Sequence, residues 1–269
     1  MGSCAVSRPA PAHHRQYAPR SPDPSGRPTP EGRADEFGGP AESHPEEAAH
    51  RAPFRPTGAG TMKLTTITNV SVDGVMQGLG LADEDRRGGF ERGGWALPLV
   101  DEETMTRLGE VYGRADAFLF GRRTYEIFAA SWGAMAGPED NPVAAPLHAR
   151  PKYVVSKTLT DPGWAHTTVL AGDPAAAVRE LKERMPGELQ VHGSGQLVRR
   201  LAAEGLIDEM LLLTYPVIVG QGTRLFPADG PDGALELVDS RATPGGVTWQ
   251  VYRPAGRPRY ATEVPPRTS

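Results

Sequence analysis

Two stretches of this chain each lead from a short apolar strand through a glycine into the start of a helix. In residues 118–126 the apolar run reaches Gly121, which two arginines and a threonine follow. In residues 189–198 the apolar run reaches a turn that contains two glycines and a serine. Strand–turn–helix units that alternate along a chain are typical of α/β proteins with a parallel sheet. They therefore constrain the fold more than any other feature of the sequence.

The remainder of residues 62–254 continues this alternation. Apolar patterning predicts helices at 101–112 and 124–131, one that starts at Asp173-Pro174, and one after the second glycine turn that Gly205 ends. It predicts strands at 63–70, 117–120, 152–156, 168–171, 189–191, 207–219 (interrupted at Pro216), 235–240 and 247–252. The last two strands flank a Pro-Gly-Gly turn, which indicates a hairpin. We expect one α/β domain with a mostly parallel central sheet, flanking helices, a loop over 132–151 and a C-terminal antiparallel hairpin.

Composition separates this domain from the two ends of the chain. Residues 1–61 contain eleven prolines and seven glycines with few large apolar side chains, so we expect a disordered N-terminal extension. Met62 directly precedes the first predicted strand. Two interpretations remain open: the start of the chain is assigned too far upstream, or the extension is a genuine flexible arm. Residues 255–269 are expected to form a flexible C-terminal tail.

Charge and cysteine content exclude several classes of partner. The net charge is −4, and the basic and acidic residues of 1–61 cancel, so the predicted domain is mildly acidic. It has no basic stripe for nucleic acid, and no run of about 20 apolar residues for a membrane. The single cysteine, Cys4, and the absence of a secretory signal fit a cytoplasmic protein. No cluster has the spacing of metal ligands, and the adjacent His13 and His14 do not form one.

The two glycine turns have the chemistry of a phosphate site. Unpaired backbone N–H groups and the helix dipole favour an anion at a helix N-terminus. Paired arginines suit a further phosphate through forked hydrogen bonds. NADPH, with its diphosphate and separate ribose phosphate, would satisfy both turns. The candidate cofactor-binding residues are Gly121, Arg122, Arg123, Thr124, Gly193, Ser194, Gly195, Gln196 and Leu197. The alternative is that the glycines only punctuate strand–helix turns and that the arginines are solvated.

Six short motifs in order make residues 62–253 resemble the dihydrofolate reductase-like superfamily. The resemblance is strongest to the branch that contains the riboflavin-biosynthesis reductase, the RibD C-terminal domain. The motifs are Ser71-Val72-Asp73-Gly74, Gly121-Arg122-Arg123-Thr124-Tyr125-Glu126, Val154-Val155-Ser156-Lys157-Thr158, Gly193-Ser194-Gly195-Gln196-Leu197, Gly205-Leu206-Ile207-Asp208-Glu209 and Pro216-Val217-Ile218-Val219-Gly220-Gln221-Gly222. The resemblance implies NADPH as cofactor, a small-molecule substrate and a homodimer. It also implies hydride transfer to a pterin-like or aminopyrimidine-like substrate, as in 5-amino-6-(5-phosphoribosylamino)uracil reductase activity.

The same resemblance implies roles for individual residues. By motif match, Arg122 would face the 2′-phosphate and Thr124 the diphosphate. Ser156 would join the adenosine-phosphate site, and residues 193–197 would cradle the diphosphate. The backbone of Val75 and Met76 would border the nicotinamide.

The source of a proton for the reduction has several candidates. Asp101 would serve as a buried carboxyl with a raised pKa, with Glu102 as the competing acid; the alternative is that Asp101 caps a helix. His192 could be a proton donor or a wall of the site, or it could satisfy a backbone group at the end of a buried strand. Asp73 reads as a turn former.

These observations predict an NADPH-dependent reductase that acts on a small C=N or C=O substrate. The loops at 74–94 and 132–151 are its candidate walls or lids. Two alternatives remain. One is a binding module of the same fold that holds a dinucleotide or a pterin without turnover. The other is an enzyme that uses the cofactor on an unrelated carbonyl or nitro substrate.

Overall fold

The computed structural model of this chain describes residues 62–261. The predicted N-terminal extension (residues 1–61) and the last part of the predicted C-terminal tail (residues 262–269) lie outside the described residues.

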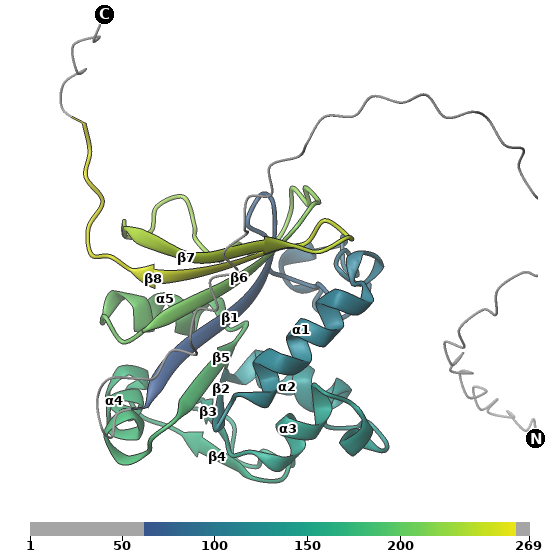
Figure 1. Cartoon of the computed structure of the whole chain (residues 1–269). Helices are drawn as coiled ribbons and strands as arrows, with labels where there is room; N and C mark the ends of the chain where they lie inside the picture. Colours follow the sequence, from purple (N-terminus) through teal and green to yellow (C-terminus); the bar gives the residue numbers. More distant parts are fainter. Residues whose placement is uncertain (1–61, 262–269) are drawn as a thin grey trace, which may run out of the picture. The chain divides into compact units, whose positions relative to one another are not determined.

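Eight strands form a single sheet in the order β4-β3-β2-β5-β1-β6-β8-β7 (Figure 1). Its six strands from β4 to β6 run parallel, β8 pairs antiparallel with β6, and β7 pairs antiparallel with β8. The mostly parallel sheet and the antiparallel C-terminal hairpin are therefore confirmed. The strands are β1 (Lys63–Ser71), β2 (Ala117–Gly121), β3 (Lys152–Val155), β4 (Thr167–Leu170), β5 (Glu188–His192), β6 (Glu209–Tyr215), β7 (Leu235–Ala242) and β8 (Thr248–Pro254).

Within residues 62–261, five α-helices cover the two faces of the sheet (Figure 1). They are α1 (Glu102–Gly113), α2 (Arg122–Ser131), α3 (Ala144–Ala149), α4 (Pro174–Arg184) and α5 (Gly195–Ala203), with short 3₁₀ turns at Arg87–Gly89, Leu97–Leu99 and Pro138–Asp140. Strand β2 shows why helices pack on both faces of the sheet. Ala117 and Leu119 pack in the apolar cluster that contains residues of α4 and α5. Phe118 and Phe120, which alternate with them, pack with residues of α1, α2 and α3.

Two predicted segments end or begin elsewhere than expected. The apolar run at 207–219 forms strand β6 only as far as Tyr215, because Pro216 has no N–H to donate to a ladder. The predicted loop at 132–151 contains the short helix α3. Its start is fixed by Asn141, whose Oδ1 accepts hydrogen bonds from the backbone N–H groups of Val143 and Ala144. An asparagine at a helix start was the available signal, but the surrounding prolines obscured it.

The central strand β1 carries three buried hydroxyl groups that should lower the stability of the fold. The hydroxyls of Thr65, Thr66 and Thr68 are buried and have no hydrogen-bond partner among the described residues. Burying a hydroxyl without a partner is unfavourable. We expect Thr66→Val to raise the free energy of unfolding by about 1 kcal/mol, as measured by denaturant titration. Thr214→Val is the matched control, because the Thr214 hydroxyl bonds Gln250 Oε1 at 3.1 Å and its removal should lower stability. A loss of stability in both variants would contradict this prediction.

Candidate functional site

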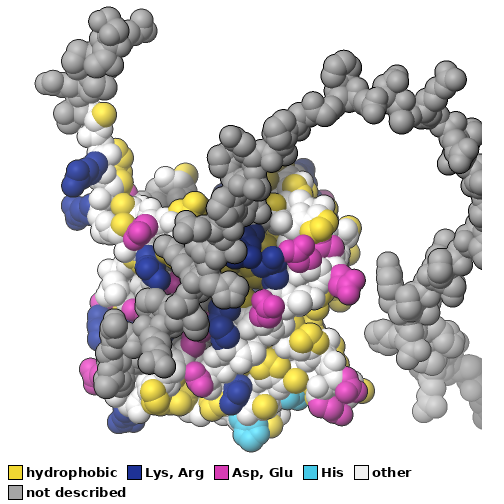
Figure 2. Space-filling model, in the orientation of Figure 1, with side chains coloured by type: hydrophobic (Ala, Val, Ile, Leu, Met, Phe, Trp, Pro, Cys, Tyr) yellow, Lys and Arg dark blue, Asp and Glu magenta, His cyan; other side chains and the backbone are white. Residues whose placement is uncertain are grey.

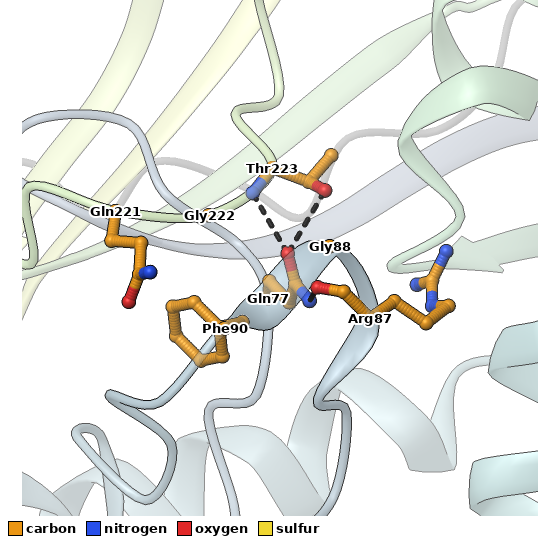
Figure 3. A pocket seen from close by; sticks show the side chains of 7 residues that line it. All are labelled: Gln77, Arg87, Gly88, Phe90, Gln221, Gly222 and Thr223. Carbon is orange, nitrogen blue, oxygen red and sulfur yellow. Dashed lines mark hydrogen bonds between the residues drawn. The ribbon is translucent and has the colours of Figure 1, made fainter.

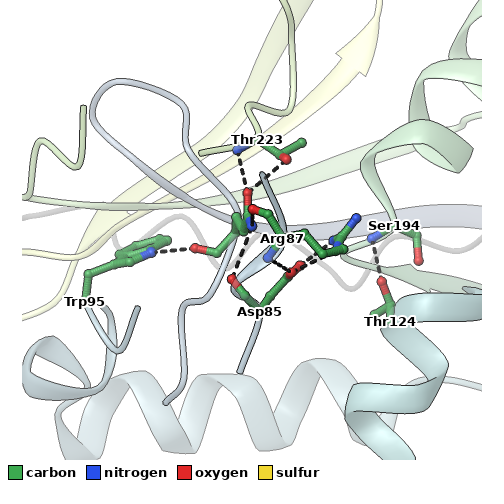
Figure 4. A network of polar contacts seen from close by, with 7 residues as sticks. Asp85, Arg87, Trp95, Thr124, Ser194 and Thr223 are labelled. Carbon is green, nitrogen blue, oxygen red and sulfur yellow. Dashed lines mark hydrogen bonds and ion pairs between the residues drawn. The ribbon is translucent and has the colours of Figure 1, made fainter. Parts of the chain in front are cut away.

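The two predicted glycine turns meet at the edge of the sheet that is formed by the carboxyl ends of its parallel strands. Strands β2 and β5 are neighbours, with Leu119 paired to Val191, so α2 and α5 begin side by side. The backbone N–H of Gly121 donates to Ser194 Oγ at 2.9 Å. The backbone N–H of Ser194 donates to Thr124 Oγ1 at 3.1 Å (Figure 4). The two motifs, more than 60 residues apart in the sequence, therefore form one connected structure.

The N-termini of these two helices differ from those of α1 and α4. Helices α1 and α4 are capped by the carboxylates of Asp101 and Asp173, which accept hydrogen bonds from backbone N–H groups of the first turn. Helices α2 and α5 follow Gly121 and Ser194, and neither of these residues makes a side-chain cap. Unpaired N–H groups are thus available at two adjacent helix N-termini, an arrangement that favours a bound anion.

The backbone of the second turn is held in an unusual conformation. Gly193 and Ser194 both have left-handed φ angles, +53° and +51°. Only glycine adopts this conformation without cost, so Ser194 is a strained residue of the kind that concentrates at functional sites. A Cβ atom on Gly195 would lie 2.6 Å from the Met76 sulfur. Met76, expected near the nicotinamide, therefore packs directly against the start of α5.

The remaining predicted cofactor residues lie along the same edge. Arg122 and Arg123 are exposed in the first turn of α2. Arg122 forms an ion pair with Glu126 at 3.2 Å. Ser156 follows β3, whose Val155 pairs with Gly121, and Ser156 Oγ accepts hydrogen bonds from the N–H groups of Thr158 and Leu159. The structure thus brings these predicted residues together, and their binding of a cofactor remains a prediction.

A loop after β1 contributes polar groups that the sequence analysis did not identify individually. Gln77 Nε2 donates to the backbone carbonyls of Asp85 (3.1 Å) and Arg87 (3.0 Å). Gln77 Oε1 accepts from the N–H and the hydroxyl of Thr223, both at 3.0 Å. Beside Gln77 lies a cavity of about 420 Å³ (Figure 3), lined by Gln77, Arg87, Gly88, Phe90, Gln221, Gly222 and Thr223. The one available signal was the charged, glycine-rich composition of residues 74–94.

Asp101 has a structural role that removes the basis for its predicted catalytic one. Its carboxylate accepts hydrogen bonds at 2.7 Å from the N–H groups of Thr104, in α1, and Gly245, in the β7–β8 turn. Hydrogen bonds from Thr104, and then from Gly245, lower the pKa of Asp101 to about 2. A carboxyl with a lowered pKa is ionised at neutral pH and has no proton to donate. Asp101 is therefore the N-cap of α1, and Glu102, the competing acid, is exposed.

His192 is a core residue rather than a proton donor. It lies among Tyr112, Phe118, Phe120 and Phe128, with ring centroids 4.2–6.2 Å away. Its Nε2 lies 3.0 Å from the side-chain oxygen of Gln190, so its partner is a side chain and not the expected backbone group. Burial lowers the pKa of His192 to about 3, and the imidazole is neutral at physiological pH.

Figure 2 shows basic and acidic side chains interspersed over the described residues of one face. Between residues 62 and 261, no group of three or more His, Cys, Asp or Glu side chains is placed to hold a metal ion. In the same part of the chain, no helix has the length and apolar character needed to cross a membrane.

Comparison with known proteins gives consistent matches. The RibD C-terminal domain family matches residues 62–249. The uncharacterized protein YyaP of Bacillus subtilis is 26% identical over 143 residues, which cover 51% of this chain and 73% of that protein. The crystal structure of a putative riboflavin biosynthesis protein from Shewanella has a TM-score of 0.50 at 20% identity, covering 72% of this chain and 99% of that one. A pyrimidine reductase-like protein from Corynebacterium diphtheriae has a TM-score of 0.45 at 15% identity, covering 72% and 92% of the two chains.

Proposed function

Because the chain belongs to the RibD C-terminal domain family, which supports a reductase-like fold, we propose that it is an NADPH-dependent reductase of a small C=N or C=O substrate. One observation carries the proposal: the N-termini of α2 and α5 lack side-chain caps and are joined through Gly121, Ser194 and Thr124. Substrates of the pterin or aminopyrimidine class are those to test first.

The residues at this edge fit the chemistry of a phosphorylated dinucleotide. Free N–H groups at the start of α5 suit the diphosphate, and Gly193 and Gly195 leave the turn without side chains that would block it. The guanidinium of Arg122, in the first turn of α2, suits the separate 2′-phosphate. NADPH supplies a hydride when bound, and the protein binds and orients it and keeps water away.

We assign the lid to the loop at residues 74–94, which Gln77 holds in place through its hydrogen bonds. A single buried amide ties residues 85–87 to Thr223 and so holds this part of the loop in place. Met76, the residue before Gln77, packs against the start of α5. A loop held in this way can cover a bound cofactor and exclude water from the reacting atoms. Solvent or the substrate itself would then supply the proton, because the Asp101 carboxyl is ionised at neutral pH and the His192 imidazole is neutral and buried among aromatic rings.

The proposal is tested by binding and by turnover, measured separately. NADPH at a hundred times its Kd should stabilise the full chain by about 2.7 kcal/mol in thermal or chemical unfolding. Oxidation of NADPH should then depend on one member of a panel of pterins, aminopyrimidine ribosides, imines, carbonyl and nitro compounds. Absence of any binding would refute the proposal.

The alternative of a binding module without turnover retains one specific observation in its favour. The carboxylate that was expected to deliver the proton caps α1 and is ionised. Tight NADPH binding without oxidation across the whole panel would support this alternative over the reductase.

A further inference from the structure

Arg87 lies in the loop after β1 (residues 74–94), and its side chain extends toward the start of α5 (Figure 4). Figure 4 draws its guanidinium in contact with Asp85 of the same loop and on the side of Ser194. Its backbone carbonyl is fixed by Gln77 Nε2 at 3.0 Å, and Gln77 is fixed by Thr223. The position of Arg87 therefore does not depend on the contacts of its own side chain, which is free to exchange partners.

The present partner of Arg87 is the carboxylate of Asp85. Arg87 Nε donates to Asp85 Oδ1 at 2.7 Å, and Arg87 Nη2 donates to Asp85 Oδ2. This two-point fork is the geometry by which a guanidinium binds either a carboxylate or a phosphate. The Arg87 side chain remains 48% exposed, whereas that of Asp85 is only 7% exposed.

A second cation acts on the same carboxylate. Burial alone would raise the pKa of Asp85, but the hydrogen bonds and charge of Arg87, together with the charge of Arg123, lower it. Arg123 lies in the first turn of α2. The loop after β1 and the start of α2 therefore each contribute a guanidinium whose charge acts on Asp85.

On the basis of the proposed function, we propose that Arg87 is a further guanidinium of the dinucleotide site, that it contacts the diphosphate, and that Asp85 holds its fork until phosphate replaces the carboxylate. When the guanidinium changes partner, Asp85 Oδ1 keeps the hydrogen bond that it accepts from the Arg87 backbone N–H at 3.2 Å, so the nearly buried carboxylate is not left without a donor. A diphosphate offers the same fork together with the free N–H groups at the start of α5. Arg87 points at the α5 turn, whereas Arg122 lies on α2, so the two arginines contact different phosphates.

The two contacts can be separated by comparing cofactors. We expect Arg87→Ala to weaken NADPH and NADH alike, by about 10- to 100-fold, in calorimetric titrations of the full chain. Arg86→Ala is the matched control: its side chain is the neighbouring exposed arginine, and affinity should not change. An unchanged Kd in Arg87→Ala, or a loss confined to NADPH, would overturn the assignment.

A second variant predicts a change in the opposite direction. Asp85→Asn removes the competing charge and frees the guanidinium, so NADPH should bind several-fold more tightly. A purely structural role of Asp85 would instead weaken binding, and that result would overturn the exchange. Asp83→Asn, at an exposed acid of the same loop, should leave Kd unchanged. If the wild-type protein binds neither NADPH nor NADH, the proposed function is wrong. If it binds both, and Arg87→Ala binds them with the same Kd values, only the assignment of Arg87 is wrong.

Discussion

Arg122→Ala is expected to weaken NADPH binding by about 10- to 100-fold and to leave NADH binding unchanged. NADPH differs from NADH only by the 2′-phosphate, and Arg122 is the exposed guanidinium assigned to that group. A charge-assisted hydrogen bond to a phosphate contributes about 1.5–3 kcal/mol, which sets the expected range. Isothermal calorimetry of both cofactors on the same protein preparation measures the difference directly.

The ion pair between Arg122 and Glu126 does not prevent this role. Their side chains are 44% and 46% exposed, and an exposed pair four residues apart on a helix is worth only about 0.3–0.5 kcal/mol. A 2′-phosphate, with nearly two negative charges, should displace the Glu126 carboxylate. Glu126→Gln is the matched variant and should bind NADPH slightly more tightly. Equal losses for both cofactors in Arg122→Ala would refute the assignment.

The sequence predicted the parts of the fold that depend on local patterning. The apolar run of β2, which ends at Gly121 just before α2, was sufficient to predict that strand–turn–helix unit, and the alternation of strands with helices predicted the parallel sheet. The parts it did not predict depend on weaker local signals. Helix α3 has only six residues and includes Pro146, so its periodicity is too short to detect.

The candidate site also contains residues that local sequence patterns predicted and residues that they did not. Gly121 and Ser194 could be identified because each belongs to a local strand–turn–helix pattern. The hydrogen bonds of Gln77 could not, because they join it to Thr223, 146 residues away. The error over Asp101 has a different cause: an acid before a helix fits both a proton donor and an N-cap. The hydrogen bond from the Thr104 N–H, together with the one from Gly245 in the β7–β8 turn, decides between them.

Asp73 should be one of the most destabilising positions to change, although the sequence indicated only a turn former. Its carboxylate accepts hydrogen bonds from the N–H groups of Val219 (2.9 Å) and Gly220 (2.8 Å). It also accepts one from the Ser71 hydroxyl at 2.7 Å, and it pairs with Arg224 at 3.2 Å. Asp73→Ala leaves these donors without a partner at the junction of β1 and the loop after β6. We expect it to lower the free energy of unfolding by about 2–4 kcal/mol in denaturant titrations at pH 7.

The pH dependence of stability identifies the charge of Asp73 as the cause. Burial would raise its pKa, but the hydrogen bonds from Ser71, Val219 and Gly220 outweigh burial and hold the pKa well below its usual value. A group whose pKa is lower in the folded state stabilises the protein above its unfolded pKa of about 3.9 and loses that contribution as the pH falls. The difference in unfolding free energy between wild type and Asp73→Asn should therefore be largest near pH 7 and shrink toward pH 3. Asp83→Asn, an exposed control, should follow the wild type at every pH; a constant gap for Asp73→Asn would show that its hydrogen-bond geometry, and not its charge, stabilises the junction.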